Sequence, residues 1–264
     1  MTNYPELKVL IHGREVRWEE INHWKAIRAS RVLQELVDLH QHLYLNGKVL
    51  SENQFYQLTD DELVQAAMES KLVLSDEMIL KLYADRLKKS DAMWHEFIAK
   101  TPKDAPLKES HVILEVTGLS PTLLQGIDHE GAVNRQQAFA LHPEHYVFTQ
   151  TGSVQTVMET FGGYQNPSLF HLYMLDPQKE ALPIALDPST KAVIFGKGTL
   201  ASDELDIQQY ALHQIQPRQN GFRLDLGIFA PAGVADEAIV GHMEHFAIEF
   251  GSMIKLAIDH KRQQ

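Results

Sequence analysis

The spacing of apolar residues changes at residues 101–106, and this change constrains the fold more than any other feature of the sequence. Between about residues 19 and 100, apolar side chains recur every three or four positions, which is typical of amphipathic helices. After residue 106, short apolar runs alternate with turn-forming Gly, Pro, Asn and Asp, which predicts antiparallel strands. Pro102 and Pro106 interrupt both helix and sheet. We therefore predict a mainly helical N-terminal domain over residues 1–100 and a second domain over residues 107–264.

The second domain is expected to end in one long helix, at about residues 236–260. Strands are expected at residues 111–116, 146–149, 154–158, 169–175, 192–195, 208–215 and 221–229. Ser120 and Pro121 are typical of a helix start, and that helix should carry His129. A run of strands closed by one long helix suggests a curved sheet that grips its last helix around a cavity. The predicted fold is therefore α+β of the helix-grip type.

The composition argues against several classes of function. The chain has 35 acidic and 24 basic residues, and its formal charge of −11 argues against nucleic acid or an anionic membrane as the main partner. The absence of cysteine rules out disulfides, iron–sulfur clusters and thiol nucleophiles, and it fits a cytoplasmic protein. No signal-peptide pattern and no apolar run of roughly 20 residues is present. We expect a soluble cytoplasmic protein that acts on a small molecule.

The last predicted helix carries a pair of side chains suited to a metal ion. His245 and Glu249 are four residues apart, so both project from one face of the helix, and His242 lies one turn earlier on nearly the same stripe. Imidazole and carboxylate groups suit a zinc-like divalent ion, and the chain has no thiolates to use instead. The alternative is an ordinary helix-stabilising pair on a solvated face.

Three other polar residues stand in segments that could carry chemistry, and each has an ordinary alternative. His129 lies beside two acidic residues, as a surface histidine would. Glu159 lies in an apolar run, either on the polar face of an edge strand or buried with a partner. His213 shares a strand face with apolar residues, so it is either a pocket histidine with a tuned pKa or a hydrogen-bonded core histidine. The sequence has no Gly-rich phosphate loop and no Gly-x-Ser-x-Gly elbow.

Taken together, these segments resemble the diacetylphloroglucinol hydrolase and phloretin hydrolase family over about residues 110–255. The matching segments, in order, are Gly118-Leu119-Ser120-Pro121, His129, Arg135, Pro143-Glu144-His145-Tyr146, Glu159-Thr160-Phe161-Gly162-Gly163, His213-Gln214-Ile215-Gln216-Pro217 and His245-x-x-x-Glu249.

The resemblance implies a zinc-dependent carbon–carbon hydrolase of acylated phenols, with a helix-grip (Bet v 1-like) catalytic domain. It also implies a set of four ligands for zinc or a similar divalent metal, and a pocket histidine at His213. The implied ligands are His129, Glu159, His245 and Glu249.

The chain departs from the family just ahead of His129. The family has aromatic residues there, whereas residues 123–128 of this chain read LLQGID. The alternative function is therefore a non-catalytic helix-grip protein that binds a small apolar ligand. The helical first hundred residues are expected to serve homodimerisation or to act as a lid.

Overall fold

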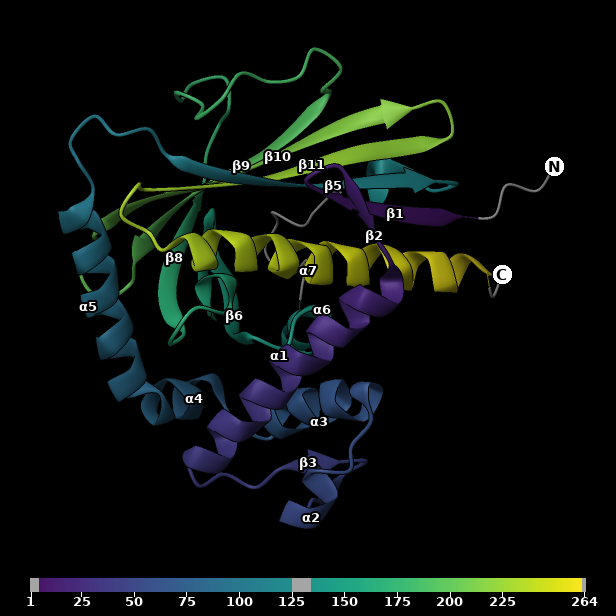
Figure 1. Cartoon of the computed structure of the whole chain (residues 1–264), viewed down its shortest axis with the longest axis vertical. Coiled ribbons are helices and arrows are strands. Elements are labelled where there is room, and N and C mark those ends of the chain that lie inside the picture. The colour runs from purple at the N-terminus through teal and green to yellow at the C-terminus, as the bar shows by residue number, and fades with distance from the viewer. Residues whose placement is uncertain (1–4, 125–133, 263–264) are drawn as a thin grey trace.

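One antiparallel sheet of nine strands forms the largest part of the structure (Figure 1). The structure is a computed structural model that describes residues 5–124 and 134–262. The strand order is β2-β1-β5-β11-β10-β9-β8-β7-β6, and every neighbouring pair is antiparallel. The strands are β1 (Glu6–Ile11), β2 (Arg14–Val16), β5 (Lys108–Thr117), β6 (His145–Thr151), β7 (Val154–Glu159), β8 (Ser168–Met174), β9 (Ala192–Leu200), β10 (Asp206–Arg218) and β11 (Gly221–Ala230).

Side-chain alternation explains why these segments form a sheet with one buried face. In β5, Val112, Leu114 and Val116 are buried, and the residues between them are partly or fully exposed. Leu224 of β11 lies opposite Leu114, and both belong to the same core. A register shift of one residue would turn this apolar set toward solvent, so the pairing is strongly specified. Each strand expected from the sequence overlaps an observed one.

Helix α7 (Asp236–Arg262) lies lengthwise beneath the sheet and packs its apolar side chains into the same core (Figure 1). A short turn, η2 (Phe161–Gly163), contacts the helix at a point where each of the two segments carries a glycine. A Cβ atom on Gly241 would collide with the carbonyl oxygen of Gly162. Gly162 itself has φ 64°, in the left-handed region that glycine adopts without strain. The two glycines therefore let the end of β7 approach α7 closely.

Most of the remaining helices form a layer on the far side of α7 from the sheet (Figure 1). Their apolar faces share a second core with Phe139 and Tyr146. The remaining elements are α1 (Trp18–Asp38), β3 (Tyr44–Leu45), β4 (Lys48–Val49), α2 (Glu52–Phe55), α3 (Asp60–Leu72), α4 (Asp76–Leu82), α5 (Ala84–Lys100), η1 (Pro121–Leu124) and α6 (Arg135–Leu141). Helix α5 and η1 pack instead into the first core, through Met93, Trp94, Phe97 and Leu124. The predicted α+β class, with N-terminal helices and a long C-terminal helix, is confirmed. None of the described helices is long and apolar enough to cross a membrane.

Strands β1 and β2 precede these helices in the sequence but belong to the large sheet. Val9 of β1 lies opposite Leu114 of β5, and β2 pairs with β1. Strands β1 and β2 therefore extend the sheet to residues before the linker, and the division into domains 1–100 and 107–264 stays a prediction. The segment after Ser120 forms only the short η1 turn among the described residues, and His129 lies outside them.

Candidate metal centre

Four buried or partly buried polar side chains converge at one end of the space between the sheet and α7. His145 begins β6 and Glu159 ends β7, and the register of this hairpin places the two residues opposite each other. His245 and Glu249 project from one face of α7. Three of the four residues, Glu159, His245 and Glu249, were expected to be metal ligands.

The four distances between the two histidines and the two glutamates are close to the spacing of ligands around one ion. The Nε2 atom of His145 lies 3.5 Å from Glu159 Oε2 and 3.8 Å from Glu249 Oε1. The Nε2 atom of His245 lies 3.7 Å from Glu159 Oε2 and 3.5 Å from Glu249 Oε2. Ligands bonded at about 2.0–2.2 Å to a tetrahedral zinc lie roughly 3.3–3.6 Å apart. These separations are longer than ordinary hydrogen bonds, so each of the two imidazole nitrogens lies near both carboxylates without pairing tightly with either.

One hydrogen bond fixes the tautomer of His145. Its Nδ1 atom lies 2.9 Å from the carbonyl oxygen of Ala138. A carbonyl can only accept, so Nδ1 carries the proton and Nε2 presents its lone pair to the two carboxylates. Metal-bound histidines usually make this kind of second hydrogen bond, which also fixes the orientation of the ring. His145 is thus already arranged as a ligand through Nε2.

Burial disfavours charge on all four groups. It lowers the pKa of His145 to about 4 and that of His245 to about 3. Burial raises the pKa of Glu159 well above its usual value, and the nearby Glu249 and Glu144 raise it further. Burial also raises the pKa of Glu249, although His145 opposes this shift. A divalent cation would offset the cost of two carboxylates in such a site.

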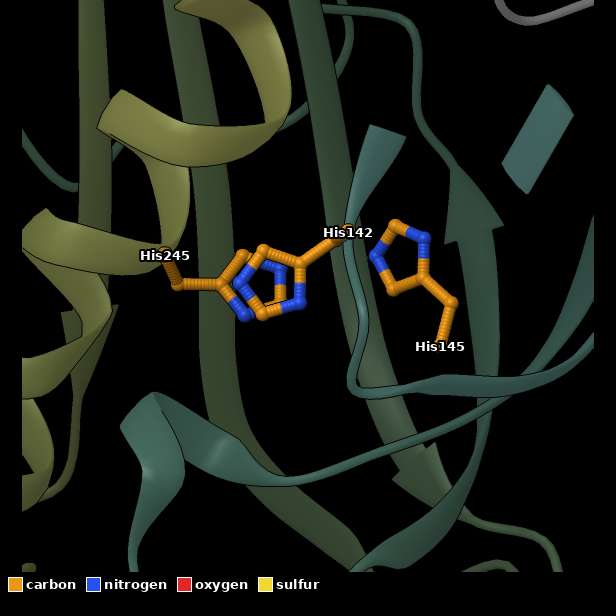
Figure 2. Close-up of side chains that lie close together, drawn as sticks. All are labelled: His142, His145 and His245. Atoms are coloured by element: carbon orange, nitrogen blue, oxygen red, sulfur yellow. The ribbon is translucent and has the colours of Figure 1, made fainter. Parts of the chain in front are cut away.

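A third histidine, His142, lies against the same centre (Figure 2). One nitrogen from each of His142, His145 and His245 lies within 4.8 Å of the others, and this buried cluster could hold a metal ion. The ring of His142 stacks on that of His245 with centroids 3.8 Å apart. The backbone N–H of Glu144 donates to His142 Nδ1 over 3.1 Å, so the neutral ring carries its proton on Nε2. In this tautomer His142 has no free lone pair, so it would have to give up the hydrogen bond from Glu144 to serve as a ligand.

Basic side chains from the N-terminal helices hold the segment that carries His145. The amino group of Lys71 is fully buried, which lowers its pKa well below the usual value, and it donates to the carbonyl oxygens of Pro143 and His145. Lys25 donates to the carbonyl of Ala140 over 2.6 Å. The Arg28 guanidinium pairs with the buried carboxylate of Glu144 over 2.7 Å. These contacts place the helical layer directly behind the site.

A cavity of about 130 Å³ adjoins the four groups. Its walls come mainly from apolar side chains of β7 to β11 and from Phe246 and Phe250 of α7. His213 lines the cavity, and its ring meets those of Phe246 and Phe250 edge-on at 5.0 and 5.2 Å. Burial lowers the pKa of His213 to about 4, and its Nδ1 has no hydrogen-bond partner among the described residues. His213 is therefore a neutral pocket histidine outside the group of four.

Sequence reasoning did not identify His145 as a ligand. His129, implied by the family resemblance, lies outside the described residues, so its place in the ligand set stays a prediction. A signal for His145 was present in the hairpin of β6 and β7. His145 and Glu159 are each seven positions from Gly152 at the turn, so a hairpin folded there brings them near each other, and a register shift between His145 and Val147 sets them directly opposite.

Comparisons with known proteins leave the family open. No protein-family model matches the chain, and no curated protein matches it. The functional argument therefore depends on the site itself.

Proposed function

We propose that this protein is a metal-dependent hydrolase with a zinc-type centre formed by His145, Glu159, His245 and Glu249. The observation that carries the proposal is that each of two imidazole nitrogens lies 3.5–3.8 Å from both of two carboxylates at the end of a mainly apolar cavity. Nitrogen and oxygen donors at this spacing suit zinc. Membership of the helix-grip class is part of the same proposal, because an antiparallel sheet, a long helix and a cavity between them are its elements.

The proposed reaction is cleavage of a carbon–carbon bond between an acyl group and an electron-rich, ketone-like carbon. The choice of this bond rests on the resemblance to the diacetylphloroglucinol and phloretin hydrolases. A bound divalent ion would supply Lewis-acid polarisation and lower the pKa of water. The four ligands hold the ion, and the apolar walls bind the organic part of the substrate and exclude water. His213, neutral and without a partner at Nδ1, accepts or returns a proton.

Metal analysis of variants tests the ligand set. Purified wild-type protein should contain about one zinc-type ion per chain, and His145→Ala, His245→Ala and Glu249→Ala should each lose most of it. His42→Ala serves as the control, because His42 is exposed and remote from the cluster. His129→Ala belongs in the same series, since loss of metal there would add His129 to the set. A wild-type protein that binds no divalent ion would refute the proposal.

Activity assays test the reaction. Acylphloroglucinols, phloretin-like ketones and simple β-diketones should be assayed for acid release with and without a chelator. We expect chelator-sensitive release from at least one of them. His213→Ala should lower the rate by about 10²–10⁴-fold while leaving the metal content unchanged. Full turnover in this variant would remove His213 from the mechanism.

The second candidate function is that of a binding protein without chemistry. It is favoured by the low pKa of His213, about 4, which makes this side chain a weak base. Saturable binding of the same compounds without acid release would support this function over hydrolysis.

A further inference from the structure

Gln209 is a buried amide that faces the cavity and has no hydrogen-bond partner among the described residues. It lies on β10 and lines the same cavity as Ala211 and His213, which are two and four positions further along the strand. Only 7% of its surface is exposed. A buried carboxamide has two donors and an acceptor, and leaving them unpaired is unfavourable. An amide held in this way is available to a bound ligand.

The backbone around Gln209 is arranged to place this amide. The pairing of β9 and β10 shifts register between Asp206 and Gln209, and Gln208 has φ 51°, in the left-handed region. Bulges of this kind redirect side chains and are frequent next to functional sites. Gly198 lies opposite Gln209, and a Cβ atom there would collide with the amide oxygen Oε1. The missing side chain at Gly198 therefore leaves room for the amide over β9.

The charges around the cavity indicate what such an amide would bind. The described residues that line the cavity include no Lys or Arg, so an anionic ligand would find no counter-charge. A site made of a divalent ion, two carboxylates and two neutral imidazoles has no net charge. The cavity is otherwise mainly apolar. These features favour an uncharged ligand that presents a hydroxyl or carbonyl group to Gln209.

We propose that Gln209 is a specificity-determining residue that hydrogen-bonds a hydroxyl or carbonyl substituent of an uncharged ligand in this cavity. The proposal rests on the cavity being the ligand site of the proposed function. It does not depend on whether the bound molecule is then cleaved. Gly198 contributes by keeping the position of the amide open.

The test compares two probes of nearly equal shape on the zinc-supplemented, full-length protein. One is acetophenone with hydroxyls at both meta positions, and the other has methyl groups there instead. Calorimetric titration gives the ratio of their dissociation constants for each variant. Wild type should prefer the hydroxylated probe. Gln209→Leu should reduce this preference by about tenfold or more, because the hydrogen bond to the probe is lost.

Two further variants separate recognition from folding. Gly198→Ala retains the amide but displaces it, so we expect a similar loss of preference. Gln214→Leu is the matched control on the same strand, since Gln214 is also buried but already accepts from Asp187 N at 2.7 Å and Thr190 Oγ1 at 2.9 Å. The control should keep the preference of wild type, whereas its thermal midpoint should fall. Gln209→Leu should not lower the midpoint, because it removes an unpaired polar group.

The outcomes distinguish this proposal from the proposed function. Selective binding that depends on Gln209 without acid release would support the specificity role and count against hydrolysis. Acid release with a preference unchanged in Gln209→Leu would overturn the specificity role and leave hydrolysis standing. Equal affinity of wild type for the two probes, including no measurable binding of either, also overturns the role of Gln209.

Discussion

Glu159 is the residue whose ionisation is most closely tied to the proposed metal. Its pKa lies well above the usual value because of burial and then the charges of Glu249 and Glu144. Below that raised pKa the carboxyl group holds a proton that an incoming cation must displace. His145 and His245 have no proton to release near neutral pH, since their pKa values are about 4 and 3. The carboxyl side of the site, and not the imidazoles, is therefore where protons compete with the ion.

We predict that zinc binding at about pH 6 releases protons, and that Glu159 contributes up to about one of them. Calorimetric titrations in two buffers of different ionisation enthalpy would measure it. Glu159→Gln, which keeps the shape but cannot ionise, should bind zinc more weakly and release fewer protons. Identical binding enthalpies for wild type in the two buffers would contradict the prediction.

The residues of the proposed metal site could be predicted from the sequence only in part. His245 and Glu249 could be predicted because helical spacing alone puts them on one face. His145 could not be identified as a candidate ligand without the hairpin register, because its position beside Glu159 depends on the pairing of β6 with β7. The cost of burying Glu159 also became visible only when its neighbours were known.

At the scale of elements, the contact between η2 and α7 sets the distance across the site. Glu159 lies two residues before η2, and His245 lies one helical turn after Gly241. We predict that Gly241→Ala pushes η2 away from α7 and lowers the metal affinity, at a stability cost of about 1–3 kcal/mol from overpacking. Chelator competition and denaturant unfolding would measure the two effects.

Gly251→Ala provides the control for that experiment. A Cβ atom on Gly251 would lie 3.0 Å from the ring of Trp18, so it would meet a side chain, whereas a Cβ atom on Gly241 would meet backbone. Gly251 also lies farther along α7, away from η2. Metal affinity should stay near that of wild type in this variant. If Gly241→Ala bound metal as tightly as Gly251→Ala, the glycine contact would have no part in shaping the site.

The link between α3 and the start of β6 gives a second prediction at this scale. Lys71→Met removes the amino group that binds the carbonyls of Pro143 and His145, so the segment carrying His145 is held less firmly. Loss of such an outer contact typically lowers metal affinity by about 10–100-fold. The d–d absorption of the cobalt-substituted protein would report the altered ligand geometry. An unchanged spectrum and affinity would show that Lys71 serves only the fold.

At the scale of the whole molecule, five buried histidines in the described part of the chain make the fold sensitive to acid. Burial lowers the pKa of each below the ordinary value of 6.5. They are His142, His145, His213, His242 and His245. In the unfolded chain they bind protons near pH 6.5, but in the folded chain they do not until the pH is far lower. Their contribution to stability is therefore complete above about pH 6.5 and falls as the pH drops toward 4.

We predict that the metal-free protein loses about 1 kcal/mol of stability per buried histidine between about pH 7.5 and 5.5. Glu159 and Glu249 act in the opposite direction, because their raised pKa values favour the folded state as the pH falls. Urea unfolding across this range in the presence of a chelator would measure the balance. A flat profile would mean that these histidines are not buried in the folded protein.

The sheet as a whole was only partly predictable. Alternation located its strands, and the long apolar stripe located α7, because both are local patterns. The pairing of β1 with β5 joins residues about a hundred positions apart, and no local pattern encodes it. The same applies to the layer of helices packed behind His145, whose contacts come from separate parts of the chain.

The pairing of β1 with β5 also limits how the molecule can be divided. A fragment that starts at residue 107 would lack β1, and β5 would become the outermost strand. Its row of backbone N–H and C=O groups would then be open to another chain. Such a fragment would be prone to stack edge to edge with copies of itself. The linker that looks like a boundary in the sequence is therefore a poor place to cut, because β1 protects the edge of a strand that is synthesised much later.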